Sequence, residues 1–203
     1  GVEGTVQELV SLIHSRAERP IDAGRVMCDD AAGEPAEHYF LNVTDVGIGA
    51  SVVERLRKRH SYLSSNLNYL KAIISTFLTY RHMELGVTSD EGLDWQGRAL
   101  ALVAANGCYF GSGLCVAPGA SIDDGKLFLT LVGDASIVDF LMNLGRLKRG
   151  IPLDNPVAEY HQASSVHVTC PGRPAPVEAD GEFLGYTPAV IEIMPGAVTF
   201  LAP

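Results

Sequence analysis

The spacing of apolar and polar residues divides the chain into many short strands interrupted by a few helices. Apolar residues recur at three- and four-residue steps in three segments, which predicts helices over residues 5–16, 61–85 and 136–149. A further, basic helix is expected after Ala50. The face of the 61–85 helix that carries Leu63, Leu67 and Leu70 is typical of core packing. The sharper alternative is a helix that also covers the tail of an apolar ligand.

Period-two alternation of apolar residues indicates the strands. It predicts strands over residues 21–27 and 39–43, around 100–104 and 127–131, and four short ones at 166–168, 175–177, 189–193 and 197–201. The chain has 21 glycines and 11 prolines, which supply the tight turns that such strands need. The pattern predicts an α+β, mainly β fold: an antiparallel β-sandwich domain with about three to four inserted or flanking helices.

Composition narrows the class of protein. Hydrophobic residues make up 47% and charged residues 19% of the chain, as expected of a folded globular protein. A formal charge of −9 argues against nucleic-acid binding, which needs clustered Lys and Arg. No signal peptide is recognisable, and the longest apolar stretch is too short to span a bilayer, so we expect a cytoplasmic protein, peripheral at the membrane at most. The four cysteines form no C-x-x-C pair and are expected to be buried free thiols.

Two glycine-containing segments invite comparison with nucleotide-binding loops, and neither fits. Residues 119–126 have five residues between their glycines rather than four, and Leu127 stands where a P-loop has Ser or Thr. Gly111-Ser-Gly113 begins a dinucleotide fingerprint, but Val116 occupies the position of the third glycine. Neither segment therefore matches a known nucleotide-binding loop.

Two Asp-Gly pairs are more informative. Asp124-Gly125 and Asp180-Gly181 each precede a predicted strand, and Asp-Gly between strands is a strong hairpin signal. A chemical interpretation rests on Asp180 and Glu182, because residues two apart in an extended segment point to the same side. Two converging carboxylates could bind magnesium, or one could act as a general base, and the spacing does not decide between these.

The order of several segments resembles the second domain of the diacylglycerol kinase catalytic family, which includes bacterial lipid kinases and sphingosine kinases. The resemblance covers nearly all of residues 19–203 and rests on residues 40–50, 103–107, 110–113, 118–125 and 180–182. In that family a preceding domain carries a G-G-D-G-T nucleotide loop, which this sequence lacks. The resemblance implies that residues 1–20 are a connecting helix from a missing N-terminal nucleotide-binding domain, and that residues 21–203 form the β-sandwich domain.

The resemblance also implies roles for individual residues. Asp180 and Glu182 would face the cleft between the domains, one as the base on the lipid hydroxyl and both helping to organise ATP and magnesium. Asn106 is a further candidate for nucleotide binding. A structural magnesium ion would be held by Asp124 with backbone carbonyls from Ser121 and Lys126, and helices within residues 49–80 would cover the lipid tail.

The expected function is therefore that of the C-terminal domain of an ATP- and Mg²⁺-dependent lipid kinase that phosphorylates a lipid hydroxyl, inactive as an isolated fragment. Its expected partners are the lipid, the missing domain and, transiently, a membrane surface; a homodimer is left open. The basic segments 55–59 and 146–149 could touch anionic headgroups or simply be solvated helix ends. The alternatives are a non-catalytic lipid-binding module of the same fold, or an enzyme acting on a soluble nucleotide, as NAD kinases do.

Overall fold

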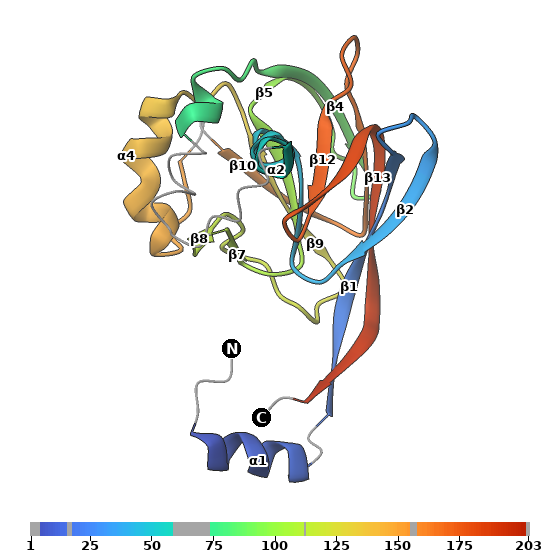
Figure 1. Ribbon diagram of the computed structural model, residues 1–203, viewed down its shortest axis with the longest axis vertical. Helices are drawn as coiled ribbons and strands as arrows, with labels where there is room; N and C mark the ends of the chain where they lie inside the picture. Colours follow the sequence, from blue (N-terminus) through green and yellow to red (C-terminus); the bar gives the residue numbers. More distant parts are fainter. Residues whose placement is uncertain (1–4, 16–17, 59–73, 112, 155–157, 202–203) are drawn as a thin grey trace.

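The computed structural model describes residues 5–15, 18–58, 74–111, 113–154 and 158–201 (Figure 1). Three helices are α1 (Val6–Ser15), α2 (Ile48–Lys58) and α4 (Ile137–Lys148), and residues 74–77 form a further helical turn. The strands are β1 (Glu18–Asp29), β2 (Pro35–Phe40), β3 (Val43–Gly47), β4 (Met83–Ser89), β5 (Asp94–Ala99), β6 (Ala101–Ala105), β7 (Tyr109–Phe110), β8 (Leu114–Cys115), β9 (Leu127–Val132), β10 (Ala158–Ala163), β11 (Ser165–Thr169), β12 (Pro176–Ala179) and β13 (Glu182–Leu201).

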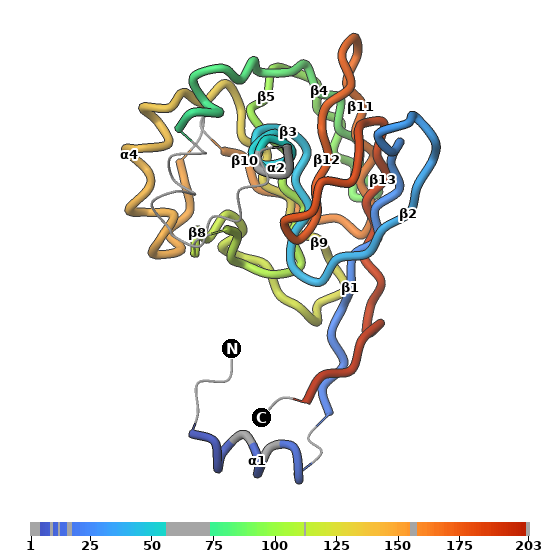
Figure 2. Tube along the Cα trace, viewed as in Figure 1, coloured from blue at the N-terminus to red at the C-terminus, as the bar shows by residue number. Residues whose placement is uncertain are grey.

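Eleven of these strands form one sheet. Its order is β10-β9-β6-β3-β12-β13-β11-β4-β5, with β1 and β2 joined to it through β13, and all of its pairs are antiparallel. The sheet curls around its own core, and β7 and β8 form a separate small hairpin (Figures 1 and 2). The predicted α+β, mainly β class is confirmed.

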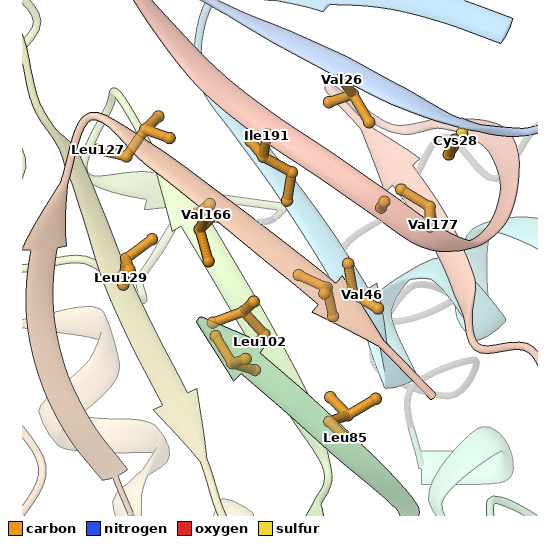
Figure 3. Close-up of a cluster of buried hydrophobic side chains, with 14 of the residues drawn as sticks. Val26, Cys28, Val46, Leu85, Leu102, Leu127, Leu129, Val166, Val177 and Ile191 are labelled. Atoms are coloured by element: carbon orange, nitrogen blue, oxygen red, sulfur yellow. The ribbon is translucent and has the colours of Figure 1, made fainter. Parts of the chain in front are cut away.

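The inner face of the curled sheet carries the main core. Alternate residues of β3, β6 and β9, such as Val46, Leu102 and Leu129, point into it and meet Val26 and Ile191 from β1 and β13 (Figure 3). The other residues of the same strands face outward, where Val43, Val103 and Ala105 form a smaller buried cluster with Ala117. Both faces of the β3–β6 part of the sheet are therefore covered, which explains why β3 and β6 are buried along their whole length.

A two-stranded arm formed by β1 and β13 projects beyond the body of the domain (Figure 2). Its register runs from Glu18 opposite Leu201 to Asp29 opposite Tyr186. Helix α1 lies at the end of this arm (Figure 1) and exposes Val6, Val10 and Ile13.

Several element predictions are confirmed and others are wrong. Helices predicted at 5–16 and 136–149 are present, the second beginning with a capping box in which the Ser136 hydroxyl accepts the N–H of Asp139. The predicted helix over 61–85 is wrong at its end, because residues 83–85 belong to strand β4; residues 59–73 lie outside the described part. The strand expected over 39–43 is broken at Leu41 and Asn42, and the last two predicted strands are one long strand, β13.

Candidate functional site

The Asp180-Gly181 pair forms the two-residue turn between β12 and β13, as predicted. Both residues have positive φ angles, 48° for Asp180 and 86° for Gly181. This is the backbone of the hairpin turn that Asp-Gly favours. Because Asp180 lies in the turn and not in an extended strand, the expectation that its side chain and that of Glu182 share a side through strand alternation does not apply.

The carboxylate of Asp180 is held by the connection between β2 and β3. It accepts the backbone N–H groups of Leu41 at 2.8 Å, Asn42 at 3.1 Å and Val43 at 2.9 Å, and the Asp180 N–H donates to the carbonyl of Val43 at 2.9 Å. Three consecutive N–H groups form a concave binding site for an anion. Asp180 therefore fastens the hairpin turn to the start of β3.

Glu182 has a different environment. It is exposed at the first position of β13, and no hydrogen bond or ion pair to its side chain occurs within the residues that the structure describes. The two predicted catalytic carboxylates thus lie at one turn but differ in function: Asp180 is committed to backbone N–H groups, and Glu182 is available to a ligand.

Two further carboxyl groups lie buried behind this turn, and the sequence analysis missed both. Asp45 and Glu178 are 3% and 0% exposed. Burial raises the pKa of Asp45 to about 7, although the N–H groups of Ala50 and Gly49 partly offset it. Burial, and then the nearby Asp45, raises the pKa of Glu178 to about 9, so Glu178 is protonated at neutral pH. In the sequence, the only sign of these two buried groups is one acidic residue within each of two mostly apolar segments.

The contacts of these two groups tie them to the neighbouring elements. Asp45 Oδ1 accepts the N–H of Ala50 at 2.7 Å at the start of α2, and a Cβ on Gly49 would lie 2.8 Å from that carboxylate oxygen. A side chain at position 49 would therefore push α2 away from β3. Glu178 Oε2 accepts the N–H of Gly181 at 2.9 Å, which connects it to the hairpin turn, whereas Glu178 Oε1 is buried without a partner among the described residues.

One row of side chains runs across the outer face of the sheet from this turn. Its members are successive partners on β12, β3, β6, β9 and β10, namely Glu178, Asp45, Val103, Thr130 and Tyr160. Residues directly opposite each other on antiparallel strands point to the same face. The row therefore begins beside the Asp180-Gly181 turn and continues across the outer face of the sheet to β10.

An apolar pocket covers four members of this row, all except Glu178. Its volume is about 130 Å³, and helices α2 and α4 together with the β7–β8 hairpin supply the other walls, with side chains such as Ile48, Val52, Phe110, Leu114, Phe140 and Leu147. The mixture of a long apolar wall with the carboxyl groups of Asp45 and Asp139 is suited to an amphiphile. Helix α2 and residue Phe77 lie on this wall, so the described part of the predicted cover, residues 49–80, contributes to the pocket.

Asn106, the predicted nucleotide contact, is fully buried. Its Nδ2 donates to the backbone carbonyls of Asp22 at 2.9 Å and Leu41 at 2.8 Å. The N–H groups of Asn106 and Gly107 both donate to the carbonyl of Asn42, and a Cβ on Gly107 would lie 2.2 Å from Asn42 Oδ1. In this arrangement Asn106 holds the 41–43 segment that binds Asp180, and a direct contact with a nucleotide stays a prediction.

Comparisons with known proteins agree with this architecture. Residues 42–202 match the family model described as the YegS C-terminal NAD kinase beta sandwich-like domain. This chain belongs to that family. A diacylglycerol kinase of Mycobacterium tuberculosis is 26% identical over 183 residues, covering 90% of this chain and 57% of the relative. A YegS-like lipid kinase of Pseudomonas fluorescens is 28% identical over 150 residues, covering 70% of this chain and 48% of the relative.

The YegS C-terminal domain is also similar to a solved structure. A crystal structure of a diacylglycerol kinase from Bacillus anthracis superposes with a TM-score of 0.63 at 18% identity, covering 98% of this chain and 59% of that one. At this identity the likeness establishes the fold. The chain spans about half to three fifths of the length of these relatives, all of which are kinases by name.

The loop in which this YegS domain was predicted to hold magnesium is not a hairpin. Gly125 has a φ of 70°, but β8, the strand before the loop, pairs with β7 and not with β9. The buried Asp22 carboxylate, another residue that the sequence analysis missed, accepts the N–H groups of Gly125 and Gly196, each at 2.7 Å. Asp22 thus fixes the loop to both strands of the arm.

Asp124 is exposed in this loop, and its Oδ1 accepts the N–H of Lys126 at 3.0 Å. The Lys126 ammonium pairs with Glu91. Across the described ranges no group of three or more His, Cys, Asp or Glu side chains could hold a metal ion. The predicted set of Asp124 with carbonyls of Ser121 and Lys126 has only one carboxylate, but its donors are all oxygens, the ligand type that magnesium prefers. Magnesium at this loop stays a prediction.

One arginine in each basic segment makes local contacts. Arg146 pairs with Asp154 and donates to the carbonyl of Pro152, and Arg55 donates to the carbonyl of Ser75 and the hydroxyl of Thr79. These contacts favour a structural interpretation of Arg55 and Arg146. Within the described residues no helix is long and apolar enough to cross a membrane.

Proposed function

We propose that this YegS domain is the lipid-binding half of an ATP- and Mg²⁺-dependent lipid kinase, which transfers a phosphoryl group to a lipid hydroxyl. One observation carries the proposal: an apolar pocket on the outer face of the sheet continues, through Asp45 and Glu178, to the turn that presents Glu182. The names of the relatives support a lipid substrate, since they are diacylglycerol and lipid kinases.

In this proposal the pocket binds the acyl or sphingoid chain. Each methylene that leaves water for an apolar wall contributes roughly 0.8 kcal/mol, so a few buried carbons suffice to orient the lipid. The polar end of the lipid would then lie towards the acidic end of the side-chain row. Burial raises the pKa of Glu178 to about 9, so Glu178 is neutral in this dry position at pH 7, and it raises the pKa of Asp45 to about 7, so Asp45 can take up a proton there.

Glu182 is the proposed general base. An alcohol is a poor nucleophile at neutral pH, and a carboxylate that takes its proton during phosphoryl transfer removes this obstacle. Glu182 is exposed and unoccupied by other described groups, whereas three N–H groups engage Asp180. Asp180 would therefore position the turn, and Glu182 would accept the proton.

A second domain must supply the nucleotide loop in this proposal, since the sequence has none. We propose that it contacts the α1 end of the domain, where apolar side chains are exposed. Magnesium, when bound to the phosphates, would offset the charge on the transferring group. A further ion at Asp124 would add a structural link to the 119–126 loop.

The test is an assay of the protein together with any coding sequence that precedes Gly1. Labelled ATP, Mg²⁺ and a panel of diacylglycerol, monoacylglycerol and sphingoid bases are supplied, and labelled lipid is measured. We expect phosphorylation of at least one lipid hydroxyl, and its loss when Mg²⁺ is removed. Absence of lipid phosphorylation by the complete protein, with ATP binding intact, would contradict the kinase proposal.

The apolar pocket alone also supports a second candidate, a lipid-binding module without catalysis. This candidate predicts that long-chain lipids displace an apolar fluorophore bound to the isolated domain. It also predicts that the complete protein transfers no phosphate from ATP to a lipid. The kinase assay and the displacement assay together separate the two functions.

A further inference from the structure

Two of the four cysteines lie side by side at the edge of the apolar pocket. The Sγ atoms of Cys108 and Cys115 are 2.7 Å apart, and both residues are free thiols. The β7–β8 hairpin brings them together, because Tyr109 pairs with Cys115 and Phe110 pairs with Leu114. Cys28 and Cys170, the other two cysteines, pack against the inner core and have no such neighbour among the described residues.

We propose that Cys108 and Cys115 form a site of reversible oxidation, joined into a disulfide by a small-molecule disulfide of the glutathione type. The two thiols need no large movement of the chain to react, because the hairpin already places them in contact. The sequence spacing gave no sign of this pair, since six residues separate the cysteines and no C-x-x-C motif is present.

A metal site is a poorer explanation of the same pair. Structural zinc takes four side-chain ligands, and two thiols supply only half of them. No third Cys, His, Asp or Glu completes a metal-binding group within the described ranges. The pair therefore fits two-electron thiol chemistry better than metal binding.

The reaction begins at Cys108, the more accessible thiol of the two. Its thiolate attacks the added disulfide, forms a mixed disulfide and expels one thiolate. Cys115 then attacks Sγ of Cys108 and expels the second thiolate, so that two protein protons pass to the two small thiols. Burial and the neighbouring Cys108 raise the pKa of Cys115 to about 12, which makes Cys115 a poor first nucleophile. Its contact with Cys108 gives the second step a high effective concentration.

The bond would fix one wall of the pocket. Between the two cysteines the chain carries Phe110 and Leu114, and both line the apolar pocket. In the oxidised form the disulfide therefore fixes the positions of these two wall residues. In the reduced form only the backbone pairing of β7 with β8 holds the hairpin together. Neither a lipid nor ATP takes part in the oxidation, so the site can be tested independently of the kinase proposal.

The test treats the folded protein with oxidised glutathione, alkylates the remaining thiols and maps the peptides by mass spectrometry. We expect a peptide in which Cys108 and Cys115 are joined, lighter by two hydrogen atoms, with Cys28 and Cys170 alkylated after unfolding. Dithiothreitol should restore all four thiols. Cys170→Ser is the matched control and should leave the bond unchanged, whereas Cys108→Ser and Cys115→Ser should each abolish it.

Two outcomes would overturn the proposal. One is alkylation of all four cysteines after oxidation of the folded wild type. The other is a stable glutathione adduct on Cys108 with Cys115 still reduced, which would show that the two sulfur atoms do not meet in solution.

Discussion

At the scale of single residues, the hairpin turn separates two carboxylates that look equivalent in the sequence. Asp180 is bound by three backbone N–H groups and Glu182 by none that the structure describes. A residue whose carboxylate closes a turn should affect stability, and a residue that faces solvent should affect chemistry alone.

Substitutions at this turn test that separation in the proposed kinase. Glu182→Gln should lower turnover by about 10²- to 10⁴-fold, the usual contribution of a general base, with an unchanged melting temperature. Asp180→Asn should lower the free energy of unfolding by about 1–3 kcal/mol, because an amide cannot accept all three N–H groups as strongly. Turnover and thermal melting are measured on the same preparations. Equal melting losses in the two variants would contradict the assignment.

The buried pair predicts how stability depends on pH. The folded protein binds more protons at Glu178 and Asp45 than the unfolded chain does, because burial raises both pKa values in the fold, to about 9 and about 7. This stabilising contribution is complete below the unfolded pKa values, near 4, and is lost as the pH rises through the folded ones. The free energy of unfolding should fall by up to about 1.4 kcal/mol per pH unit for each group within that window.

Glu178→Gln should flatten this dependence, since the amide does not ionise. Urea unfolding at about pH 6 and about pH 9 should show a smaller difference for this variant than for the wild type. Glu182→Gln, on the same hairpin but exposed, serves as the control and should keep the wild-type difference. A wild-type stability that rises between these two pH values would refute the pKa assignment.

The acidic pair also marks the limit of what the sequence discloses about residues. Asp180 and Glu182 were visible because they flank a glycine in a turn motif. Asp45 and Glu178 lie in β3 and β12, which are far apart in the chain, and only the pairing of those strands brings them together. The spacing of residues along the sequence does not show which residues face each other on paired strands.

At the scale of elements, α4 has two apolar sides with different surroundings. Phe140 and Leu147 line the pocket, whereas Val138, Leu141 and Met142 are 58%, 48% and 77% exposed. Leu141 fits the apolar spacing of the helix but lies on its exposed side. An exposed apolar stripe on a helix that lines an apolar pocket is suited to brief contact with a bilayer.

A double substitution tests this contact. Leu141→Ser combined with Met142→Ser should weaken binding to phosphatidylcholine vesicles about tenfold, which corresponds to roughly 1.4 kcal/mol of lost apolar burial. Co-sedimentation with vesicles measures it. Val6→Ser, which changes an equally exposed residue on the distant α1, should leave vesicle binding unchanged. Equal losses in both variants would mean non-specific adhesion.

The 119–126 loop gives a metal prediction. Asp124→Ala removes the only carboxylate of the predicted magnesium site, so the wild type should melt at a higher temperature with Mg²⁺ than with a chelator, and the variant should not. Asp123→Ala is the neighbouring control, because Asp123 already pairs with Arg19. Identical melting of the wild type with and without Mg²⁺ would exclude the site.

Elements were predicted well where local chemistry decides them. The Ser136 capping box and the Asp-Gly turn of β12–β13 are encoded within four residues. Predictions failed where a distant partner decides. The helical spacing of residues 61–85 extended over Met83–Leu85, which pair with β5 in the sheet, and β13 keeps one direction past Pro195 because β1 lies along it.

At the scale of the whole molecule, the resemblance of segment order identified the family more reliably than any one motif did. Three of the five matched segments, 40–50, 103–107 and 180–182, meet in one hydrogen-bonded assembly: Asn106 and Gly107 hold Asn42, the 41–43 backbone holds Asp180, and Glu178 holds Gly181. Many of the residues that carry the resemblance thus shape the turn, and among the described contacts Glu182 is the acidic residue of the turn without a bonded partner.

The pairing of β13 also has a consequence for biosynthesis. β13 bonds to β1, β11 and β12, yet the ribosome makes it after every other strand of the sheet. Until it emerges, β1 has only β2 beside it, and the body of the sheet lacks its central member. Until β13 has been synthesised, the nascent chain exposes open strand edges and apolar faces, and during that interval chaperones compete with aggregation for it.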